Sequence, residues 1–450
     1  MKEKTQNRRL SLLMLLALLA GSMSFARAQS GPMTLQQCVQ YGLTKNKGVL
    51  KSKLEVDRLN EKRSETRADY LPQVTGTVSF QDNLKLQTSI LPGELIGQPG
   101  TQVPVQFGTK YNTSAGVDAK QMIYDQSLIY AMKLTRQNFK VSEINAKKTE
   151  EQLIYDIASA YYSAQISFTQ KKLVESNLSQ IDSLYKITQI QFENDAAKQL
   201  DLDKLTVNKT NLQTDLITST TTYEKQLLLL KYYMGMPLDG AIEITETNIN
   251  EQSAGAIIDT KSLNNTDLEL IQAQREVYAV TLQQIKAGYL PSLSLSFHSS
   301  IQNQQNNLRL FEKNAKWFPN SYVGVNLTVP IFDGLAKNSR VKQTKIQMEQ
   351  SVLEEEYLTE NLKMQRENAN NTLKANQAAL NSQQSNIELA QKVYAVTQAQ
   401  FVGGIATVTD LVNAENSLRE AQTNYLKALV QVKLGELDLI KSTGNIGTIK

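Results

Sequence analysis

The chain contains the same ordered set of short motifs twice. The offsets between the first and second copies of three motifs are 219, 208 and 209 residues. A period of about 210 residues is far too long for a stacked solenoid repeat, so it predicts two copies of one large structural half. The paired motifs are YLPQV at 70–74 and YLPSL at 289–293, GV at 116–117 and 324–325 with Asp125 and Asp333, and TQIQF at 188–192 and TQAQF at 397–401.

Residues 1–28 have the pattern of a secretory signal peptide. A basic start at residues 2–9 precedes an apolar run at 10–20, and Ala26-Arg27-Ala28 offers a small-residue cleavage site. The alternative, a short membrane anchor, would need a longer apolar run to span a bilayer. The residue directly after the cleavage site is Gln29 and not cysteine, which argues against a lipid-anchored product. We therefore expect an exported mature chain that begins at Gln29.

Charge and composition exclude several classes of function. Cleavage would remove five of the 48 basic residues and one of the 44 acidic residues, leaving 43 of each. A neutral mature chain gives no reason to expect nucleic acid as a partner. The single cysteine, Cys38, excludes an internal disulfide, and with the single histidine, His298, it forms no cluster with metal-ligand spacing. Because the chain also lacks a phosphate-binding glycine loop and a nucleophile elbow, we expect no enzyme activity, no cofactor and no metal.

Two long stretches lack the residues that break helices. Residues 117–234 contain no glycine, no proline occurs between Pro104 and Pro237, and residues 335–402 contain neither. Such stretches predict helices of about 65 residues, or about 100 Å. Apolar residues recur every seven positions in these segments, which favours coiled-coil packing of antiparallel hairpin arms. An ordinary soluble helical bundle would account for the helices alone. One heptad line runs through Leu411, Leu418, Tyr425, Val432 and Leu439.

Segments next to the YLP motifs alternate between apolar and polar residues. Leu293, Leu295 and Phe297 alternate with serines and His298, and residues 73–81 and 322–331 follow the same pattern. Runs of about ten alternating residues are typical of transmembrane strands around a wet lumen. A soluble, half-buried hairpin is the alternative for any one run.

Aromatic residues flank these strands at both ends, as in the aromatic belts of membrane barrels. The polar segments at about 82–112 and 300–320 are predicted to be external loops. The predicted membrane-interface residues are Tyr70, Tyr124, Tyr289 and Phe332 at the ends near the helices, and Phe107, Tyr111, Trp317, Phe318 and Tyr322 toward the loops.

Each half is therefore predicted to contain a helix, a strand, a loop, a second strand, a long helix, a tip and a return helix. Four strands per chain cannot close a barrel, so transmembrane strands would require an oligomer, and a trimer would supply twelve. We expect a first repeat at 29–234 with strands at about 73–82 and 113–124 and a tip at about 193–201, an equatorial linker at 235–264, a second repeat at 265–444 with strands at about 291–299 and 321–332 and a tip at about 402–410, and a tail at 445–450.

This pattern resembles the TolC family of outer membrane factors over essentially the whole mature chain. The resemblance rests on the paired YLP strand entries, the VPIFDG exit at 329–334, the tip FVGGIATVTDLVNAE at 401–415, and TLQQCVQYGLTKN at 34–46. It implies a mixed α and β membrane protein: a homotrimer whose twelve-stranded β-barrel in the outer membrane of a Gram-negative bacterium continues into a helical barrel in the periplasm. It also implies a conduit for efflux or secretion, outer membrane lipid around the barrel, and helix tips that meet a periplasmic adaptor. The adaptor would link the conduit to an inner-membrane transporter of RND or ABC type.

The family's tip pattern is an aromatic residue, a glycine three positions later and an aspartate nine positions later. Phe401, Gly404 and Asp410 match it, whereas the first half has Phe192 and Asp201 but Asp195 at the glycine position. The resemblance implies a periplasmic gate at these tips. The predicted gate residues are Phe192, Asp201, Lys204, Phe401, Gly403, Gly404, Thr407, Asp410 and Asn413.

Several alternatives stay open at this point. Three copies of Asp410 around an axis would form a negative constriction, but an aspartate after Thr407 is also a suitable cap for the return helix. His298 lies on the polar side of its strand, where it is either a solvated histidine near a loop or a lumen-facing titratable group. An exported structural coiled-coil protein and the periplasmic adaptor itself are the rival functions.

Overall fold

The structure, a computed structural model, describes residues 31–246 apart from residues 93, 95, 96 and 98, and then residues 265–308 and 315–449. The predicted signal peptide and residues 247–264 of the predicted linker lie outside the described residues. The chain divides into two compact units. The first contains Met1–Leu50, Thr149–Asn264 and Met364–Lys450, and the second contains Lys51–Lys148 and Asn265–Lys363.

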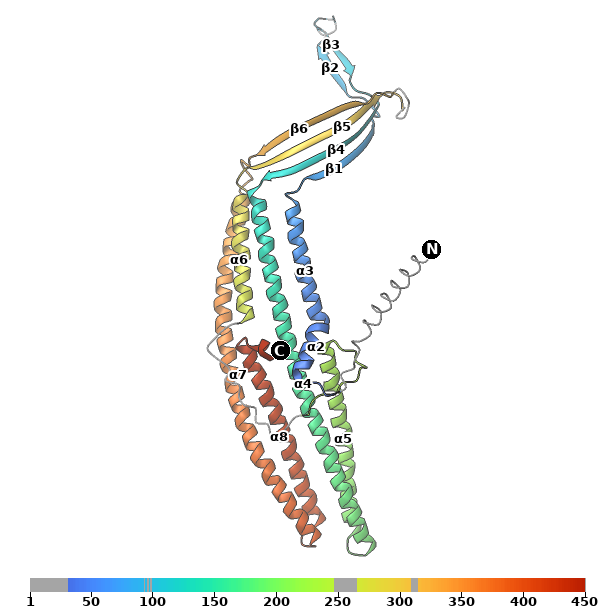
Figure 1. Ribbon diagram of the computed structural model, residues 1–450, viewed down its shortest axis with the longest axis vertical. Helices are drawn as coiled ribbons and strands as arrows, with labels where there is room; N and C mark the ends of the chain where they lie inside the picture. The colour runs from blue at the N-terminus through green and yellow to red at the C-terminus, as the bar shows by residue number, and fades with distance from the viewer. Residues whose placement is uncertain are drawn as a thin grey trace, which may run out of the picture. The chain divides into compact units, whose positions relative to one another are not determined.

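Two helical hairpins dominate the first unit (Figure 1). Helix α4, Gln126–Glu193, turns into α5, Gln199–Met234, and helix α7, Ala336–Val402, turns into α8, Val408–Ser442. The long helices α4 and α7 also supply residues to the second unit. The predicted long helices are therefore present, because no proline or glycine interrupts them.

Short elements pack against the ends of these hairpins that lie away from the tips, within the first unit. Helix α2, Leu35–Lys45, begins at a capping box in which the Thr34 hydroxyl accepts a hydrogen bond from the backbone amide of Gln37. Helix α5 ends at Gly235, whose φ of 69° favours glycine and whose missing Cβ leaves room for the Lys45 carbonyl. The 3-10 helix η2, Ile446–Ile449, covers most of the expected tail and buries Ile446.

Buried apolar side chains follow the predicted heptads. All five members of the line from Leu411 to Leu439 on α8 are buried. Near the tip, Leu411 packs in one cluster with Leu205 of α5 and Phe401 of α7. This seven-residue period keeps one face of each long helix against its neighbours, as the sequence predicted.

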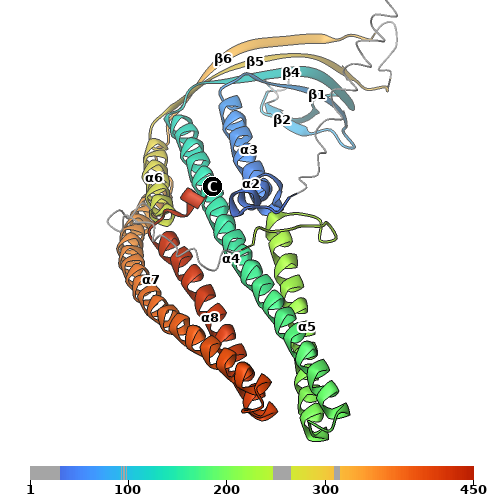
Figure 2. The same cartoon turned by 60° about the horizontal axis from the view of Figure 1, so that its bottom comes forward.

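The second unit contains an antiparallel four-stranded sheet in the order β1-β4-β5-β6 (Figures 1 and 2). The strands are β1, Gln73–Asp82; β4, Tyr111–Tyr124; β5, Ser292–Gln305; and β6, Phe318–Thr328. Strand β6 ends before residue 332, the expected boundary, because Pro330 has no amide hydrogen to continue the ladder. Helices α3, Lys47–Ala68, and α6, Thr266–Ala287, lead into β1 and β5.

The segment between β1 and β4 is more ordered than the predicted polar loop. Strands β2, Thr88–Pro92, and β3, Gln102–Gln106, form an antiparallel pair in which Leu91 lies opposite Val103. The segment predicted as a polar external loop over about 82–112 therefore contains a short hairpin, which the sequence did not predict. The three prolines of this segment favoured a loop over strands at its two short apolar runs. The pairing of those runs depends on contact between residues distant in sequence.

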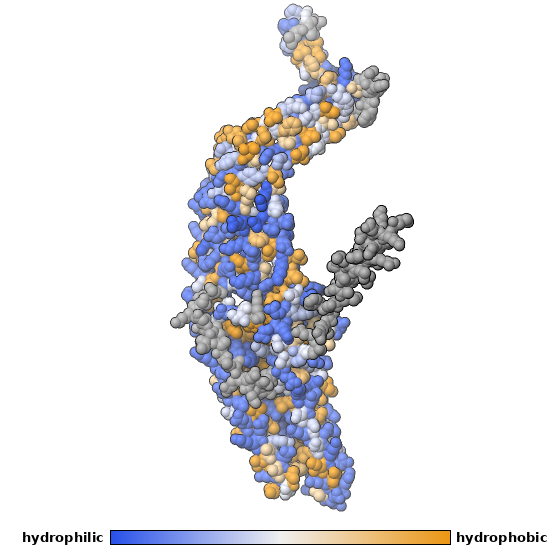
Figure 3. Space-filling view, in the orientation of Figure 1, coloured by the Kyte–Doolittle hydropathy of each residue, from blue (hydrophilic) through white to orange (hydrophobic). Residues whose placement is uncertain are grey.

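The two faces of the four-stranded sheet have different chemistry. The register places Val78, Ala115 and Ile301 in one row of neighbouring residues, while Thr75, Asp118 and His298 share another row. Because side chains alternate along each strand, these rows lie on opposite faces, one apolar and one polar. Figure 3 shows hydrophobic residues gathered over the strands, whereas the helices are mostly hydrophilic. Among the described residues, no helix combines the length and apolar character needed to cross a membrane.

Candidate functional site: helix tips and sheet faces

The two hairpin tips have the same backbone geometry. In each tip, three successive amides donate back to the last turn of the long helix, which satisfies carbonyl groups that the helix end leaves free. The donor to acceptor distances are 3.2, 3.0 and 2.7 Å for Asn194 to Ile190, Asp195 to Phe192 and Ala196 to Gln191, and 3.0, 3.0 and 2.8 Å for Gly403 to Ala399, Gly404 to Phe401 and Ile405 to Gln400.

Each tip needs one residue in the left-handed backbone region. Gly404 fills this position in the second tip with φ of 74°, and Asp195 fills it in the first tip with φ of 54°. Asp195 thus adopts the conformation that the sequence pattern assigns to glycine. Aspartate tolerates this region better than most residues, which is the signal that sequence reasoning did not use.

Asp410 caps the return helix of the second tip. Its carboxylate accepts hydrogen bonds from the Thr407 amide at 3.0 Å and the Thr407 hydroxyl at 2.7 Å. The Asp410 amide donates in return to the Thr407 hydroxyl oxygen at 3.2 Å, which completes a capping box. The hydroxyl and amide of Thr407 lower the pKa of Asp410, so the carboxylate stays charged at neutral pH.

The first tip has a weaker cap. The Asp201 carboxylate accepts a hydrogen bond from the Lys198 amide at 3.3 Å, but lysine has no side-chain oxygen to accept in return. The two aspartates identified from the sequence therefore occupy the same position in the first turn of α5 and α8. Only the second has a hydroxyl partner at the cap position.

The two tip phenylalanines lie in different environments. Phe401 is 9% exposed and packs against Leu205, Val408 and Leu411. Phe192 is 37% exposed. The sequence pattern treated them as equivalents, and only the tertiary structure separates a packed residue in the second tip from an exposed one in the first.

Polar side chains connect α5 with α8 close to the tips. The Lys204 ammonium donates to the Thr409 hydroxyl at 2.6 Å, and the Asn208 amide donates to the Glu415 carboxylate at 2.9 Å. Farther along, the Arg419 guanidinium lies 3.3 Å from the Asp215 carboxylate. Asn413, another predicted gate residue, is exposed.

Sequence reasoning missed Asn208 and Glu415, both of which are buried. Glu415 follows Leu411 by four positions and precedes Leu418 by three, which is a core position of a heptad. A polar residue at a core position of a coiled coil is the signal that could have found it. Such residues are buried, so they need partners across the interface.

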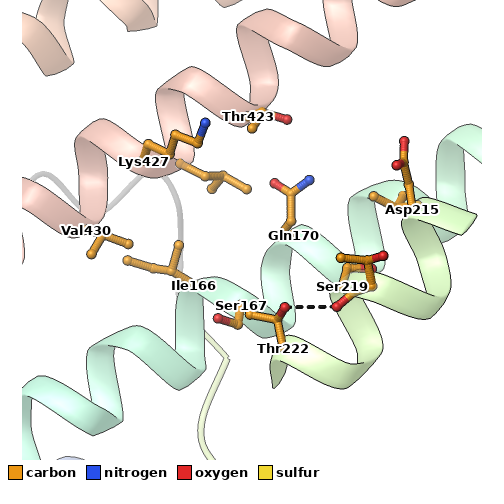
Figure 4. A pocket seen from close by; sticks show the side chains of 12 residues that line it. Ile166, Ser167, Gln170, Asp215, Ser219, Thr222, Thr423, Lys427 and Val430 are labelled. Carbon is orange, nitrogen blue, oxygen red and sulfur yellow. Dashed lines mark hydrogen bonds between the residues drawn. The ribbon is translucent and has the colours of Figure 1, made fainter. Parts of the chain in front are cut away.

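A cavity of about 370 Å³ separates the hairpins within the first unit (Figure 4). Ile166 of α4 and Leu426 and Val430 of α8 give it apolar walls. Hydroxyl groups of α5 along this cavity are directed toward the backbone of their own helix. For example, the Thr222 hydroxyl donates to the Thr218 carbonyl at 2.8 Å. No group of three or more histidine, cysteine, aspartate or glutamate residues able to hold a metal occurs anywhere in the described parts of the chain.

The predicted interface aromatics differ in their surroundings. Tyr111 stacks on Phe80 with ring centroids 6.1 Å apart, and Tyr70 donates its hydroxyl to the Asp125 carbonyl at 3.2 Å. Tyr322 instead stacks on His298 on the polar face, with centroids 5.1 Å apart. The other six predicted aromatics are exposed and lie at or beyond the strand ends: Tyr124, Tyr289, Phe332, Phe107, Trp317 and Phe318.

His298 is a partnered residue within β5. Its imidazole Nδ1 lies 2.7 Å from the Asp118 carboxylate, and its side chain is 23% exposed. The interpretation of His298 as a solvated histidine near a loop was therefore wrong. The register of β4 against β5 places Asp118 directly opposite it, and that register was not readable from the sequence.

Comparison with known proteins decides the family. Residues 39–235 and 257–445 match the family described as outer membrane efflux protein. This chain belongs to the outer membrane efflux protein family. Family membership makes it an outer membrane channel for efflux or secretion, and it sets aside the exported coiled-coil and adaptor alternatives. The family is one of transport proteins.

Individual family members are distant in sequence and close in fold. The outer membrane protein TolC of Salmonella enteritidis is 22% identical, over 96% of this chain and 89% of its own length. TolC of Escherichia coli strain K12 is 21% identical, over 94% and 86%. A solved structure of CusC has a TM-score of 0.71 at 18% identity and covers 91% of this chain and 92% of CusC, which identifies a TolC-like fold.

Proposed function

We propose that three copies of this family member form one conduit, with twelve strands closed into a barrel in the outer membrane. The order β1-β4-β5-β6 leaves β1 and β6 at the two ends of the sheet. Each has an outer edge of unpaired backbone groups, which lipid could not satisfy. Pairing β6 of one copy with β1 of the next removes every edge.

The single observation that carries this proposal is the exposed apolar face of the sheet. Val78 is 82% exposed and Val323 is 69% exposed, and several more valines and leucines on the same strands are exposed as well. A sheet face in water would not keep so many large apolar side chains uncovered. Outer membrane lipid would cover this face, and the polar face would line a lumen filled with water.

The helical hairpins extend this conduit into the periplasm in our proposal. Each chain would supply two repeats, at 29–234 and 265–444, joined by a linker at 235–264, and the six hairpins of a trimer would form a helical barrel. The matched backbone geometry of the two tips supports this duplication. The tips would meet a periplasmic adaptor that connects them to an inner-membrane transporter of RND or ABC type.

The gate would lie at the tips, and the second repeat would contribute more to it because its tip matches the family pattern more closely. Asp410 would contribute one carboxylate per chain to a ring that favours cations, in addition to capping α8. Phe401, Gly403, Gly404 and Thr407 would hold this tip in shape. In the first repeat, the ammonium of Lys204 reaches Thr409 and would weaken the negative potential of Asp201 and Asp410.

Two experiments test the proposal at separate levels. Fractionation of cells that express the full chain should give a trimer in outer membranes that dissociates only on heating; a soluble monomer in the periplasmic fraction would contradict the conduit. In single-channel recordings, Asp410→Asn should reduce cation preference, because it removes the charge but keeps an oxygen to accept from Thr407. The matched Asp201→Asn variant should have a smaller effect, and equal cation preference in all three proteins would reject the ring.

A further inference from the structure

The polar face of the sheet carries its charge in one small cluster. Within the described strands, the residues in the rows of Thr75, Asp118, His298 and Tyr322 are mostly serine, threonine, asparagine, glutamine and glycine. Asp118 and Lys120 of β4 are the acidic and basic side chains of this face, and His298 of β5 is its imidazole. The rest of this face is polar and uncharged, apart from Met122, Tyr322 and Phe318.

His298 is surrounded by groups from both neighbouring strands. Its Nδ1 lies 2.7 Å from Asp118 Oδ1, and its Nε2 lies 3.0 Å from the Ser300 hydroxyl. On the other side, the Tyr322 ring stacks on the imidazole at an interplanar angle of 28°. Lys120, two residues beyond Asp118, lies opposite Ser296. Strand β1 adds only Thr75 and Thr77 to this neighbourhood, so the charged groups that face His298 are Asp118 and Lys120.

We propose that His298 makes the wall of the conduit selective for charge in a manner that depends on pH, favouring anionic cargo in acid. This inference rests on the proposed function, because it requires the polar face to line the lumen. With a neutral imidazole, the charges of Asp118 and Lys120 cancel. A proton on the imidazole leaves one net positive charge per chain on a wall that is otherwise nearly free of charge.

The composition of the chain makes this response specific to one residue. His298 is the single histidine among the 450 residues. Imidazole is the side chain whose charge ordinarily changes between about pH 5 and pH 8. The lumen of a twelve-stranded barrel is wide, and salt screens charges within about 10 Å at 0.1 M ionic strength. The effect of His298 is therefore local, and a probe beside it measures the effect better than total current does.

The experiment uses a cysteine at Ser296 as that probe. Ser296 is two residues from His298 on the same face, which is about 7 Å along a strand. The full chain carrying Ser296→Cys in outer membrane vesicles is treated with an anionic and a cationic methanethiosulfonate of equal size. The ratio of the two modification rates reports the local potential, and thiol ionisation cancels in the ratio. The protein without Ser296→Cys is the blank for Cys38, which is buried.

We expect the ratio of anionic to cationic rates to rise about threefold between about pH 8 and pH 5.5, as one added charge at this distance requires. Adding His298→Asn should make the ratio independent of pH, and adding Asp118→Asn should raise the ratio already at pH 8. A pH response that persists in His298→Asn, or that is absent when His298 is present, would overturn the inference while leaving the conduit intact. Lack of modification by either reagent would instead contradict the lumen itself, and with it the proposed function.

Discussion

The Asn208 side-chain amide donates to the Glu415 carboxylate at 2.9 Å, and both residues are buried between α5 and α8. Among the residues that the structure describes, none forms a hydrogen bond with the second carboxylate oxygen of Glu415. Glu415 is 4% exposed, and the Asn208 amide thus supplies the hydrogen bond that its buried carboxylate accepts. Because the two residues belong to different hairpins, this bond links the first repeat to the second within a few turns of the tips.

Asn208→Ala should loosen α8 around Glu415. The substitution leaves a buried carboxylate without its hydrogen bond, which costs about 2 kcal/mol of local stability. Hydrogen exchange measured by mass spectrometry should therefore accelerate about thirtyfold in peptides around residues 411–418. The matched control is Asn177→Ala, which breaks the buried but uncharged contact of Asn177 with Gln422 and should cost about 1 kcal/mol. Equal acceleration of hydrogen exchange in both variants would show that the buried charge of Glu415 is not the reason for the effect of Asn208→Ala.

Gly404→Ala should destabilise the second tip and Gly403→Ala should not, although the two residues are neighbours. Gly404 has φ of 74°, where a side chain is strained by about 1 kcal/mol. A Cβ on Gly403 would meet only ordinary contacts, the nearest at 3.5 Å. We expect thermal unfolding of the purified protein at a lower temperature for Gly404→Ala and no decrease for Gly403→Ala. A decrease of similar size for both variants would mean that the space for a Cβ, and not the backbone conformation, determines the stability of the tip.

Thr407→Val should make the second tip less stable at neutral pH, and its stability should depend less on pH than that of the unmodified tip. The Thr407 hydroxyl is the leading cause of the lowered pKa of Asp410, so its loss raises that pKa toward the ordinary value. A lowered pKa in the folded state stabilises the cap above the ordinary aspartate pKa, and this contribution disappears as the pH falls through the lowered value. Hydrogen exchange in the first turn of α8, compared at matched pH, should be faster in the variant by about fivefold at neutral pH. The difference in protection should then diminish in acid.

Thr409→Val is the control for that experiment, because Thr409 lies in the same turn and contacts Lys204 instead of Asp410. It should leave the acid response of the tip unchanged. The same loss of protection in both threonine variants would assign the effect to general fraying of the helix end.

Cys38 should be inert in the folded protein. Its side chain is fully buried in the first unit, and burial raises the pKa of the thiol to about 12. The thiolate is the reactive form, so maleimide labelling at about pH 8 should be at least a hundredfold slower than in denaturant. Unfolding should make labelling faster, because the exposed thiol then has its ordinary pKa and more of it is thiolate. Rapid labelling without denaturant would show that the cluster around Cys38 opens readily.

Local patterns in the sequence were sufficient for the kind and approximate extent of the main elements. The lack of glycine and proline over 117–234 and 335–402 determined the long helices, since nothing in them interrupts the helical ladder. Alternation around Leu293 and Val325 determined the strands and their two faces. Asp410 following Thr407 determined the cap of α8.

Only the tertiary structure decided which distant residues meet. Asp118 faces His298 because β4 pairs with β5 in one register, and a shift of one residue would place them on opposite faces. Asn208 reaches Glu415 because α5 packs on α8, and the 207 positions between them carry no local signal of that contact. Phe192 and Phe401 occupy equivalent places in a duplicated sequence, yet Leu205, Val408 and Leu411 cover only Phe401. Periodicity is a property of neighbouring residues, whereas burial and pairing depend on how separate segments pack together.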